Sequence, residues 1–260
     1  MKFSLVIGSI LIILCSAYYF TDWKIKHRAK RQISFLKHNP KKNDIILCGD
    51  SHIEFFDLNL LKNKNAYNFG ISGEKTRGLI SRIDNIMHME SRNIICLTGI
   101  NDFLAGKSNK TILDNFENLI SKIIKNQTNH SITFLSIYPI ATDKIKKSDI
   151  VEINNYIKHQ CLKNDFNFID VHEHLTDING VLNKKYTSDG IHLNKKGQTK
   201  VADIINAYTT NFFQSLDYGF SLFNDTSNLN QFAPKLNSIS KKPLTSLHHR
   251  FDVLYYAILT

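Results

Sequence analysis

Residues 45–51 read Ile-Ile-Leu-Cys-Gly-Asp-Ser, an apolar run that ends directly in a turn. Short apolar runs bounded by turn residues predict buried strands. Three later strings also follow an apolar run or precede a helix-like stretch: Asn-Phe-Gly at 68–70, Gly-Ile-Asn-Asp at 99–102 and Asp-Gly-Ile-His at 189–192. The order and placement of these four strings decide both the fold and the candidate chemistry.

Apolar runs and helix-like stretches alternate through the body of the chain. We expect strands at 45–48, 66–69, 94–98, 132–138 and 166–171, and helices at 53–61, 76–89, 111–124, 150–162 and 195–213. Near-continuous apolar strands separated by helices predict an α/β fold, with a parallel sheet covered on both faces. In such sheets the functional site forms beyond the carboxyl ends of the strands, where the first three strings lie.

Each string supplies one part of a single reaction. Ser51 directly follows a strand and is the candidate nucleophile, because a hydroxyl at such a turn can lose its proton to a neighbouring base. His192 is the candidate base, and Asp189 is the group that orients its ring. The candidate oxyanion donors are the N–H groups of Ser51 and Gly70 and the side-chain amide of Asn101.

Two acidic residues stand beside these groups, and we expect Asp50 and Asp102 to support the loops. Taken singly, each string is an ordinary turn or helix start, in which Asp and Asn commonly act as caps. Four unrelated turns would not supply a nucleophile, a base, its orienting group and oxyanion donors. The conjunction therefore predicts a serine hydrolase.

With these residues in place, the chain resembles the GDSL-type esterases, also called SGNH hydrolases, over most of its body. The four residues that give the SGNH hydrolases their name match Ser51, Gly70, Asn101 and His192 of this chain. The resemblance implies a flavodoxin-like three-layer α/β/α fold, with a doubly wound five-stranded parallel sheet in the order 2-1-3-4-5. It also implies ester hydrolysis through an acyl-serine intermediate, without metal or other cofactor. One departure is His52, where the family usually carries an apolar residue.

The resemblance is greatest to the bacterial lysophospholipase, thioesterase and acetyl-esterase branches. We therefore expect a small acyl ester, or an acylated lipid or glycan, as the substrate. A catalytically silent binding or scaffold module with the same fold is the alternative. A second alternative is a metal site at 170–174, where Asp-Val-His-Glu-His spaces potential ligands alternately. Because no further ligand cluster accompanies this string, we expect no metal.

The N-terminal region differs in character from the body. Phe3 to Phe20 is an uncharged apolar run of 18 residues, near the minimum length of a membrane-spanning helix. Residues 22–42 then carry eight Lys and Arg against one Asp, a net charge of +7. The rest of the chain is close to neutral, so this patch favours a membrane surface over nucleic acid. We expect residues 1–21 to be a retained anchor, or alternatively a cleaved signal, and residues 22–42 a basic juxtamembrane linker.

The hydrolase domain is expected at 43–214, followed by an irregular or disordered tail at 215–260. The side of the membrane is open: the charge bias favours the cytoplasmic face, whereas a signal-like N-terminus favours the cell envelope. Because no candidate catalytic residue precedes Asp50, we expect a chain that begins at Lys41 to be soluble and fully active. Cys48 and Cys96 lie inside apolar runs and are expected to be buried.

Overall fold

The computed structural model describes residues 21–126, 130–142 and 144–224. A parallel sheet runs through the centre, and its strands are β1 (Ile45–Gly49), β2 (Ala66–Gly70), β3 (Asn93–Leu97), β4 (Ser131–Leu135) and β5 (Asn167–Ile169). The strands lie in the order β2-β1-β3-β4-β5, and every neighbouring pair is parallel. The expected doubly wound sheet and its strand order are confirmed.

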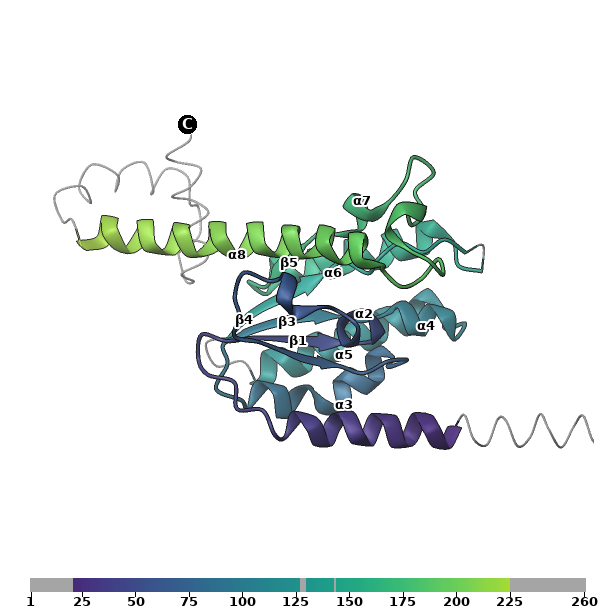
Figure 1. Cartoon of the computed structure of the whole chain (residues 1–260), viewed down its shortest axis with the longest axis horizontal. Helices are drawn as coiled ribbons and strands as arrows, with labels where there is room; N and C mark the ends of the chain where they lie inside the picture. The colour runs from purple at the N-terminus through teal and green to yellow at the C-terminus, as the bar shows by residue number, and fades with distance from the viewer. Residues whose placement is uncertain (1–20, 127–129, 143, 225–260) are drawn as a thin grey trace, which may run out of the picture.

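Helices cover both faces of the sheet (Figure 1). They are α2 (Ser51–Glu54), α3 (Thr76–Met87), α4 (Ile100–Leu104), α5 (Asn109–Asn126), α6 (Lys147–Lys163), α7 (His172–Leu175) and α8 (Lys195–Asn224), with short 3-10 turns η1 (Leu58–Leu60) and η2 (Lys184–Tyr186). A further helix, residues 21–35, lies beside α3 and is called the N-terminal helix below. Helices α3 and α5 lie on one side of the sheet and α8 on the other.

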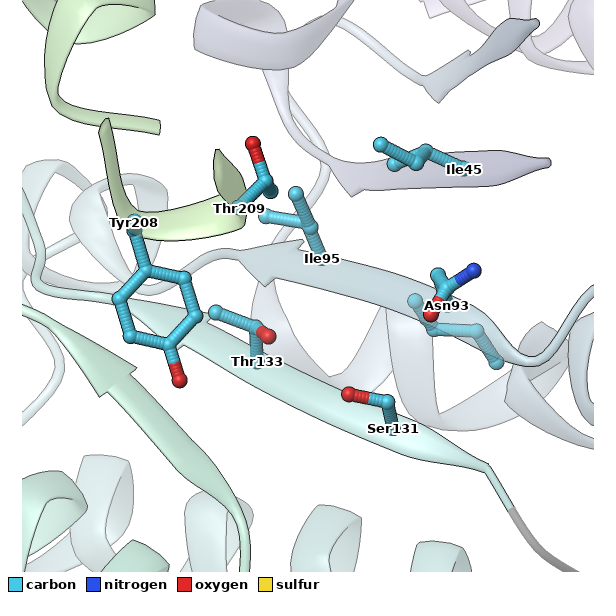
Figure 2. Close-up of a pocket in the computed structure, with 8 residues that line it drawn as sticks. Ile45, Asn93, Ile95, Ser131, Thr133, Tyr208 and Thr209 are labelled. Atoms are coloured by element: carbon cyan, nitrogen blue, oxygen red, sulfur yellow. The ribbon is translucent and has the colours of Figure 1, made fainter. Parts of the chain in front are cut away.

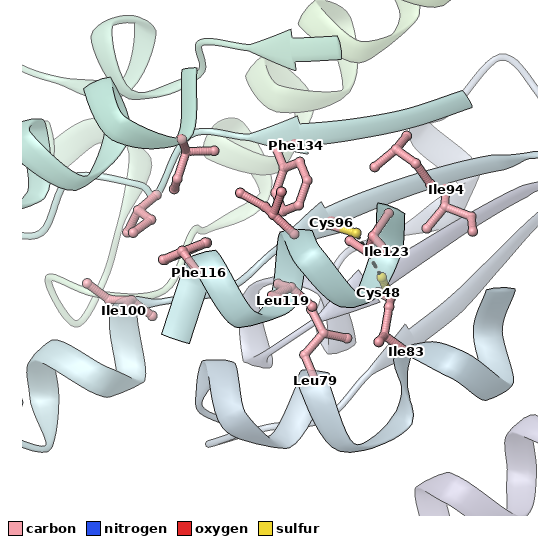
Figure 3. Close-up of a cluster of buried hydrophobic side chains, with 14 of the residues drawn as sticks. Cys48, Leu79, Ile83, Ile94, Cys96, Ile100, Phe116, Leu119, Ile123 and Phe134 are labelled. Atoms are coloured by element: carbon pink, nitrogen blue, oxygen red, sulfur yellow. Dashed lines mark hydrogen bonds between the residues drawn. The ribbon is translucent and has the colours of Figure 1, made fainter. Parts of the chain in front are cut away.

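The two faces of each strand belong to two different cores. In β1, Ile46 and Cys48 pack in the cluster that includes α3 and α5, whereas Ile45 and Leu47 pack in the cluster that includes α8. Because successive side chains of a strand point to opposite faces, a strand buried on both sides reads as a continuous apolar run. Figure 3 shows the first cluster, in which Cys48 and Cys96 are buried as expected, with their sulfurs 3.3 Å apart.

Several boundaries differ from the sequence expectations. The stretch 53–61 is not one helix but two short turns, because Asp50 caps α2 and Asp57 caps η1 separately. Strand β5 ends at Ile169, since the Asp170 side chain accepts from the N–H of His172 and turns the chain into α7.

The expected irregular tail is wrong over its first part, because α8 continues to Asn224. No proline interrupts residues 195–224, so every residue there keeps the backbone N–H that a continuous helix uses. Residues 225–260 lie outside the described residues.

The N-terminal region contains more structure than a plain linker, since residues 22–35 of the expected linker belong to the N-terminal helix. No helix within the described ranges has the length and apolarity needed to cross a bilayer. The apolar run from Phe3 to Phe20 lies outside those ranges.

Candidate active site

The turn between β1 and α2 presents Ser51. Gly49 has a φ of +152°, and a Cβ there would lie 1.8 Å from the carbonyl oxygen of Leu97, so only glycine fits. Asp50 caps α2 by accepting a hydrogen bond from the N–H of His52 at 3.0 Å. Ser51 thus begins α2, and its own N–H has no acceptor among the described residues.

The segment 189–192 brings an acid and a base to this serine. His192 Nε2 lies 3.0 Å from Ser51 Oγ, and His192 Nδ1 lies 2.7 Å from Oδ2 of Asp189. Because a carboxylate only accepts, Nδ1 carries the proton, and the neutral ring then offers Nε2 to the serine hydroxyl. The structure thus joins the expected nucleophile, base and orienting carboxylate in one chain of hydrogen bonds.

Asp189 is also held by its own loop. Its Oδ1 accepts from the N–H groups of Ile191 and His192 at 2.9 and 2.7 Å. Burial by itself raises the pKa of Asp189, but the hydrogen bonds from the His192 ring and from these two N–H groups outweigh burial. The pKa of Asp189 therefore lies well below its ordinary value, and the carboxylate stays ionised.

One of the expected oxyanion donors is engaged elsewhere. The N–H of Gly70 donates to Oδ1 of Asn68 at 3.0 Å. A Cβ at Gly70 would lie 2.2 Å from the backbone nitrogen of Glu54, so this glycine lets α2 pass close to β2. The expected donor role of Gly70 is therefore wrong in this structure, because its single N–H is already used.

Gly73 is a candidate donor that the sequence analysis missed. It is exposed, has a φ of +72°, and its N–H has no acceptor among the described residues. The carbonyl of the next residue, Glu74, accepts from Nδ2 of Asn101 at 3.1 Å, which leaves the other amide hydrogen of Asn101 for a ligand. The available signal was the second glycine of Gly-Ile-Ser-Gly at 70–73, which lies beyond the strand end.

Asp102 holds the loop that carries Asn101. Its Oδ2 accepts from the N–H and the hydroxyl of Thr76 at 2.8 and 3.0 Å, and its Oδ1 accepts from the Asn115 amide at 3.2 Å. These bonds join α4 to the start of α3 and to α5. Asp102 thus fixes the loop that carries Asn101 by hydrogen bonds, as Asp50 fixes the turn at Ser51.

Buried charges lie beneath the turn that contains Gly73. The Glu74 side chain is fully buried, and its carboxylate pairs with Arg82 at 2.6 Å and with Arg28 at 3.0 Å. Arg82 also donates to the carbonyl of Gly49 at 3.2 Å. Burial raises the pKa of Glu74, and the attraction of Arg82 and Arg28 offsets this rise only in part.

The N-terminal helix reaches the same region from outside. Arg31 donates to the carbonyl of Gly70 at 3.0 Å, and His27 lies 3.0 Å from the Glu54 carboxylate at the end of α2. Arg28, between them in sequence, is one of the two cations on Glu74. The first residues of this helix lie at the edge of the sheet that carries α2 and α4 (Figure 1).

Two cavities of the described region lie away from these residues. A cavity of about 30 Å³ lies at the amino ends of β1, β3 and β4, where α8 covers it with Tyr208 and Thr209 (Figure 2). A groove of about 480 Å³ lies between α3 and α5. Neither is lined by Ser51, His192 or Asp189.

The string at 170–174 is not gathered around one point. His172 is buried, and its Nδ1 lies 2.9 Å from the carbonyl oxygen of Ile137. Within the part of the chain that the structure describes, no three His, Cys, Asp or Glu side chains are grouped to hold a metal ion.

Comparison with known families gives a match over more than half of the chain. The sequence model described as the GDSL-like Lipase/Acylhydrolase family matches residues 56–200. Among solved structures, a Streptococcus pneumoniae protein provisionally described as a platelet activating factor is 25% identical, with a TM-score of 0.67 over 74% of this chain and 97% of that protein.

Other relatives are more distant. A GDSL-like lipase from Bacteroides thetaiotaomicron is 16% identical, with a TM-score of 0.62 over 70% of this chain and 96% of that protein, a likeness of fold alone. The N-acylneuraminate cytidylyltransferase of Streptococcus agalactiae serotype III is 25% identical over 151 residues, which are 58% of this chain and 35% of that enzyme. The chain thus spans about a third of the length of this curated relative.

Proposed function

Since the chain belongs to the GDSL-like lipase/acylhydrolase family, we propose that it is a serine hydrolase that cleaves carboxylic esters through an acyl group on Ser51. The observation that carries the proposal is the hydrogen-bond chain from Ser51 to His192 at 3.0 Å and from His192 to Asp189 at 2.7 Å. A hydroxyl in this setting gives its proton to the imidazole as it attacks a carbonyl carbon.

The reaction proceeds in two acyl transfers. Ser51 Oγ bonds to the ester carbonyl carbon while its proton moves to His192 Nε2. The N–H of Ser51, the amide of Asn101 and, in place of Gly70, the N–H of Gly73 stabilise the oxyanion. His192 then protonates the departing alcohol oxygen, which leaves the acyl group on Ser51. Water next loses a proton to His192 and attacks the acyl carbon, and Ser51 leaves with that proton.

Chemical labelling of the serine tests this proposal. We expect the full chain, purified in mild detergent, to hydrolyse p-nitrophenyl acetate and to react with a fluorophosphonate. Peptide mapping by mass spectrometry is expected to place the phosphonate on Ser51. Absence of both turnover and labelling would contradict the proposal and favour the alternative, a catalytically silent binding or scaffold module.

We propose short acyl esters, carried by a glycan or a lipid, as the substrate class. The side chains of His192 and Asp189 are 38% and 54% exposed, which leaves the site open to a bulky alcohol group. Neither of the two cavities described above adjoins Ser51, so neither would receive a long acyl chain bound there. The Streptococcus agalactiae relative is named for an N-acylated sugar, neuraminate, so we propose a glycan as one carrier of the ester. A lysophospholipid is the other class.

A series of p-nitrophenyl esters separates these classes. From acetate through butyrate and octanoate to palmitate, we expect kcat/KM to fall at least about tenfold. An acyl chain that no apolar protein surface covers does not gain the roughly 0.8 kcal/mol per buried methylene, and a longer chain hinders the approach of the carbonyl carbon to Ser51. Rates are corrected with the Ser51→Ala variant. A kcat/KM that rises with chain length would contradict the short-acyl preference and favour the lipid class.

We also propose that the run from Phe3 to Phe20 holds the enzyme at a membrane, with those basic residues of 22–42 that do not bind Glu74 or Gly70 beside anionic headgroups. We expect the full chain to sediment with membranes and to resist extraction by alkaline carbonate. A soluble mature protein that begins near Tyr18 would instead identify a cleaved signal. Protease treatment of intact cells distinguishes the cytoplasmic face from the cell envelope.

A further inference from the structure

His52, the residue after Ser51, is buried, with a side chain only 2% exposed. Its Nδ1 lies 3.2 Å from Oδ1 of Asp50, the residue before Ser51. Its Nε2 lies 3.0 Å from the carbonyl oxygen of Ile191, the residue before His192. One imidazole thus spans the two chain segments that must keep the nucleophile and the base in register.

From these contacts we propose that His52 is a positioning residue which, as an imidazolium, ties the turn that carries Ser51 to the segment that carries His192. Both partners of the ring, the Asp50 carboxylate and the Ile191 carbonyl, can only accept hydrogen bonds. A neutral imidazole has one N–H, so one of the two contacts would set a lone pair against an acceptor. Only the doubly protonated ring satisfies both ends of the bridge.

The charges around His52 favour the same form. Asp50 is fully buried, and its only ion pair within the described residues is with His52. Glu74, another buried carboxylate of this region, is already paired with Arg82. A buried carboxylate without a counter-charge is costly, so the cation on His52 compensates Asp50.

The remaining groups that face the ring are Tyr138, His192 and Asp189. The Tyr138 ring meets His52 edge-on at 4.9 Å, and burial together with Asp50 raises the pKa of its hydroxyl, which stays neutral. The His192 ring lies 5.7 Å away. Asp189, which is ionised, adds a second negative charge that acts on His52.

The balance of these effects sets the protonation of His52. Burial by itself lowers the pKa of His52, but the hydrogen bond and charge of Asp50, the Ile191 carbonyl and the charge of Asp189 together raise it above the ordinary value. Because the folded form has the higher pKa, the bridge is fully formed below the ordinary pKa of histidine. It is lost as the pH rises through the raised value.

The consequence for activity rests on the proposed function. Catalysis needs His52 charged, so we expect kcat to fall as the pH rises through the raised pKa of His52, which gives an alkaline limb in a plot of kcat against pH. A histidine that only filled space would not produce the alkaline limb.

Two substitutions and a matched control test this assignment. His52→Leu removes both bonds, and we expect kcat to fall by up to about 10²-fold with KM changed less than about twofold, since a small displacement of reacting groups is costly. His52→Gln retains an amide donor for the Ile191 carbonyl, so kcat recovers in part while the alkaline limb disappears. His172→Gln, at another buried histidine, is expected to keep the alkaline limb.

Nitrogen NMR of the histidine rings gives a readout independent of turnover. In the full chain in detergent micelles, we expect both ring nitrogens of His52 to be protonated at pH 7, with the signals assigned by their loss in His52→Gln. A neutral His52 in an active enzyme, or an unchanged alkaline limb in His52→Gln, would overturn the proposal. Absence of turnover in the wild-type chain would contradict the proposed function instead.

Discussion

Replacing either Ser51 or His192 by alanine is expected to lower kcat/KM by about 10⁴-fold or more, and replacing both is expected to lower it little further. The two side chains act through one hydrogen bond of 3.0 Å, so removing either partner ends the proton transfer that both perform. Steady-state hydrolysis of p-nitrophenyl acetate by the two single variants and the double variant measures this coupling. If the losses in activity of the two single variants multiplied in the double variant, the two side chains would act independently, which would contradict this prediction.

Asn101→Ala is the matched control, because it leaves the hydrogen-bond chain of the triad intact. It removes one oxyanion donor and is expected to lower kcat by about 10²-fold, more than it changes KM. This variant should still react with a fluorophosphonate, whereas Ser51→Ala should not. A variant that changed KM alone would show that Asn101 does not serve the transition state.

The second large effect is expected on removing residues 1–40. The sequence suggests that a chain beginning at Lys41 is fully active, because no catalytic candidate precedes Asp50. The structure leads to the opposite expectation. Phe35, at the end of the N-terminal helix, is 6% exposed and stacks on Phe69 of β2 at 4.5 Å between ring centroids. Loss of one buried phenylalanine typically costs about 3–5 kcal/mol of unfolding free energy.

The same truncation removes charges from the catalytic edge. Glu74 would lose Arg28 and keep only Arg82, and the carbonyl of Gly70 would lose its bond from Arg31. These contacts brace the turn that carries Gly73, so we expect kcat to fall as well as stability. A domain of this size shifts its melting temperature by about 2–4 °C per kcal/mol, which predicts a decrease on the order of 10 °C.

A chain that begins at Thr21 is the control for this experiment. It lacks the apolar run but retains the whole N-terminal helix, so it separates the loss of that helix from the loss of a membrane anchor. We expect it to match the full chain in melting temperature and in activity on a water-soluble ester. Equal melting temperature and kcat in the chains that begin at Thr21 and Lys41 would contradict a structural role of this helix.

The features that the sequence predicted correctly are those set by local chemistry. Strands buried on both faces must be apolar throughout, so residues 45–48 and 94–98 indicated a parallel sheet without any knowledge of their neighbours. Asp189 precedes His192 by three residues in one loop and contacts its ring, so their pairing could also be predicted from the sequence. The doubly wound order then places the strand ends, and with them Ser51, at one edge.

Other features depend on groups that only folding brings together. Which glycine has an N–H available for the oxyanion depends on competing acceptors. The Asn68 side chain accepts from the N–H of Gly70, whereas the N–H of Gly73 has no acceptor among the described residues. The basic residues after the apolar run predicted a juxtamembrane linker, yet Arg28 pairs with Glu74, a carboxylate that only the folded chain buries. His52 became a bridge because the segment before His192 lies over it. Periodicity and turn chemistry act over a few residues, whereas these hydrogen bonds and charges are fixed by contacts between segments far apart in the chain.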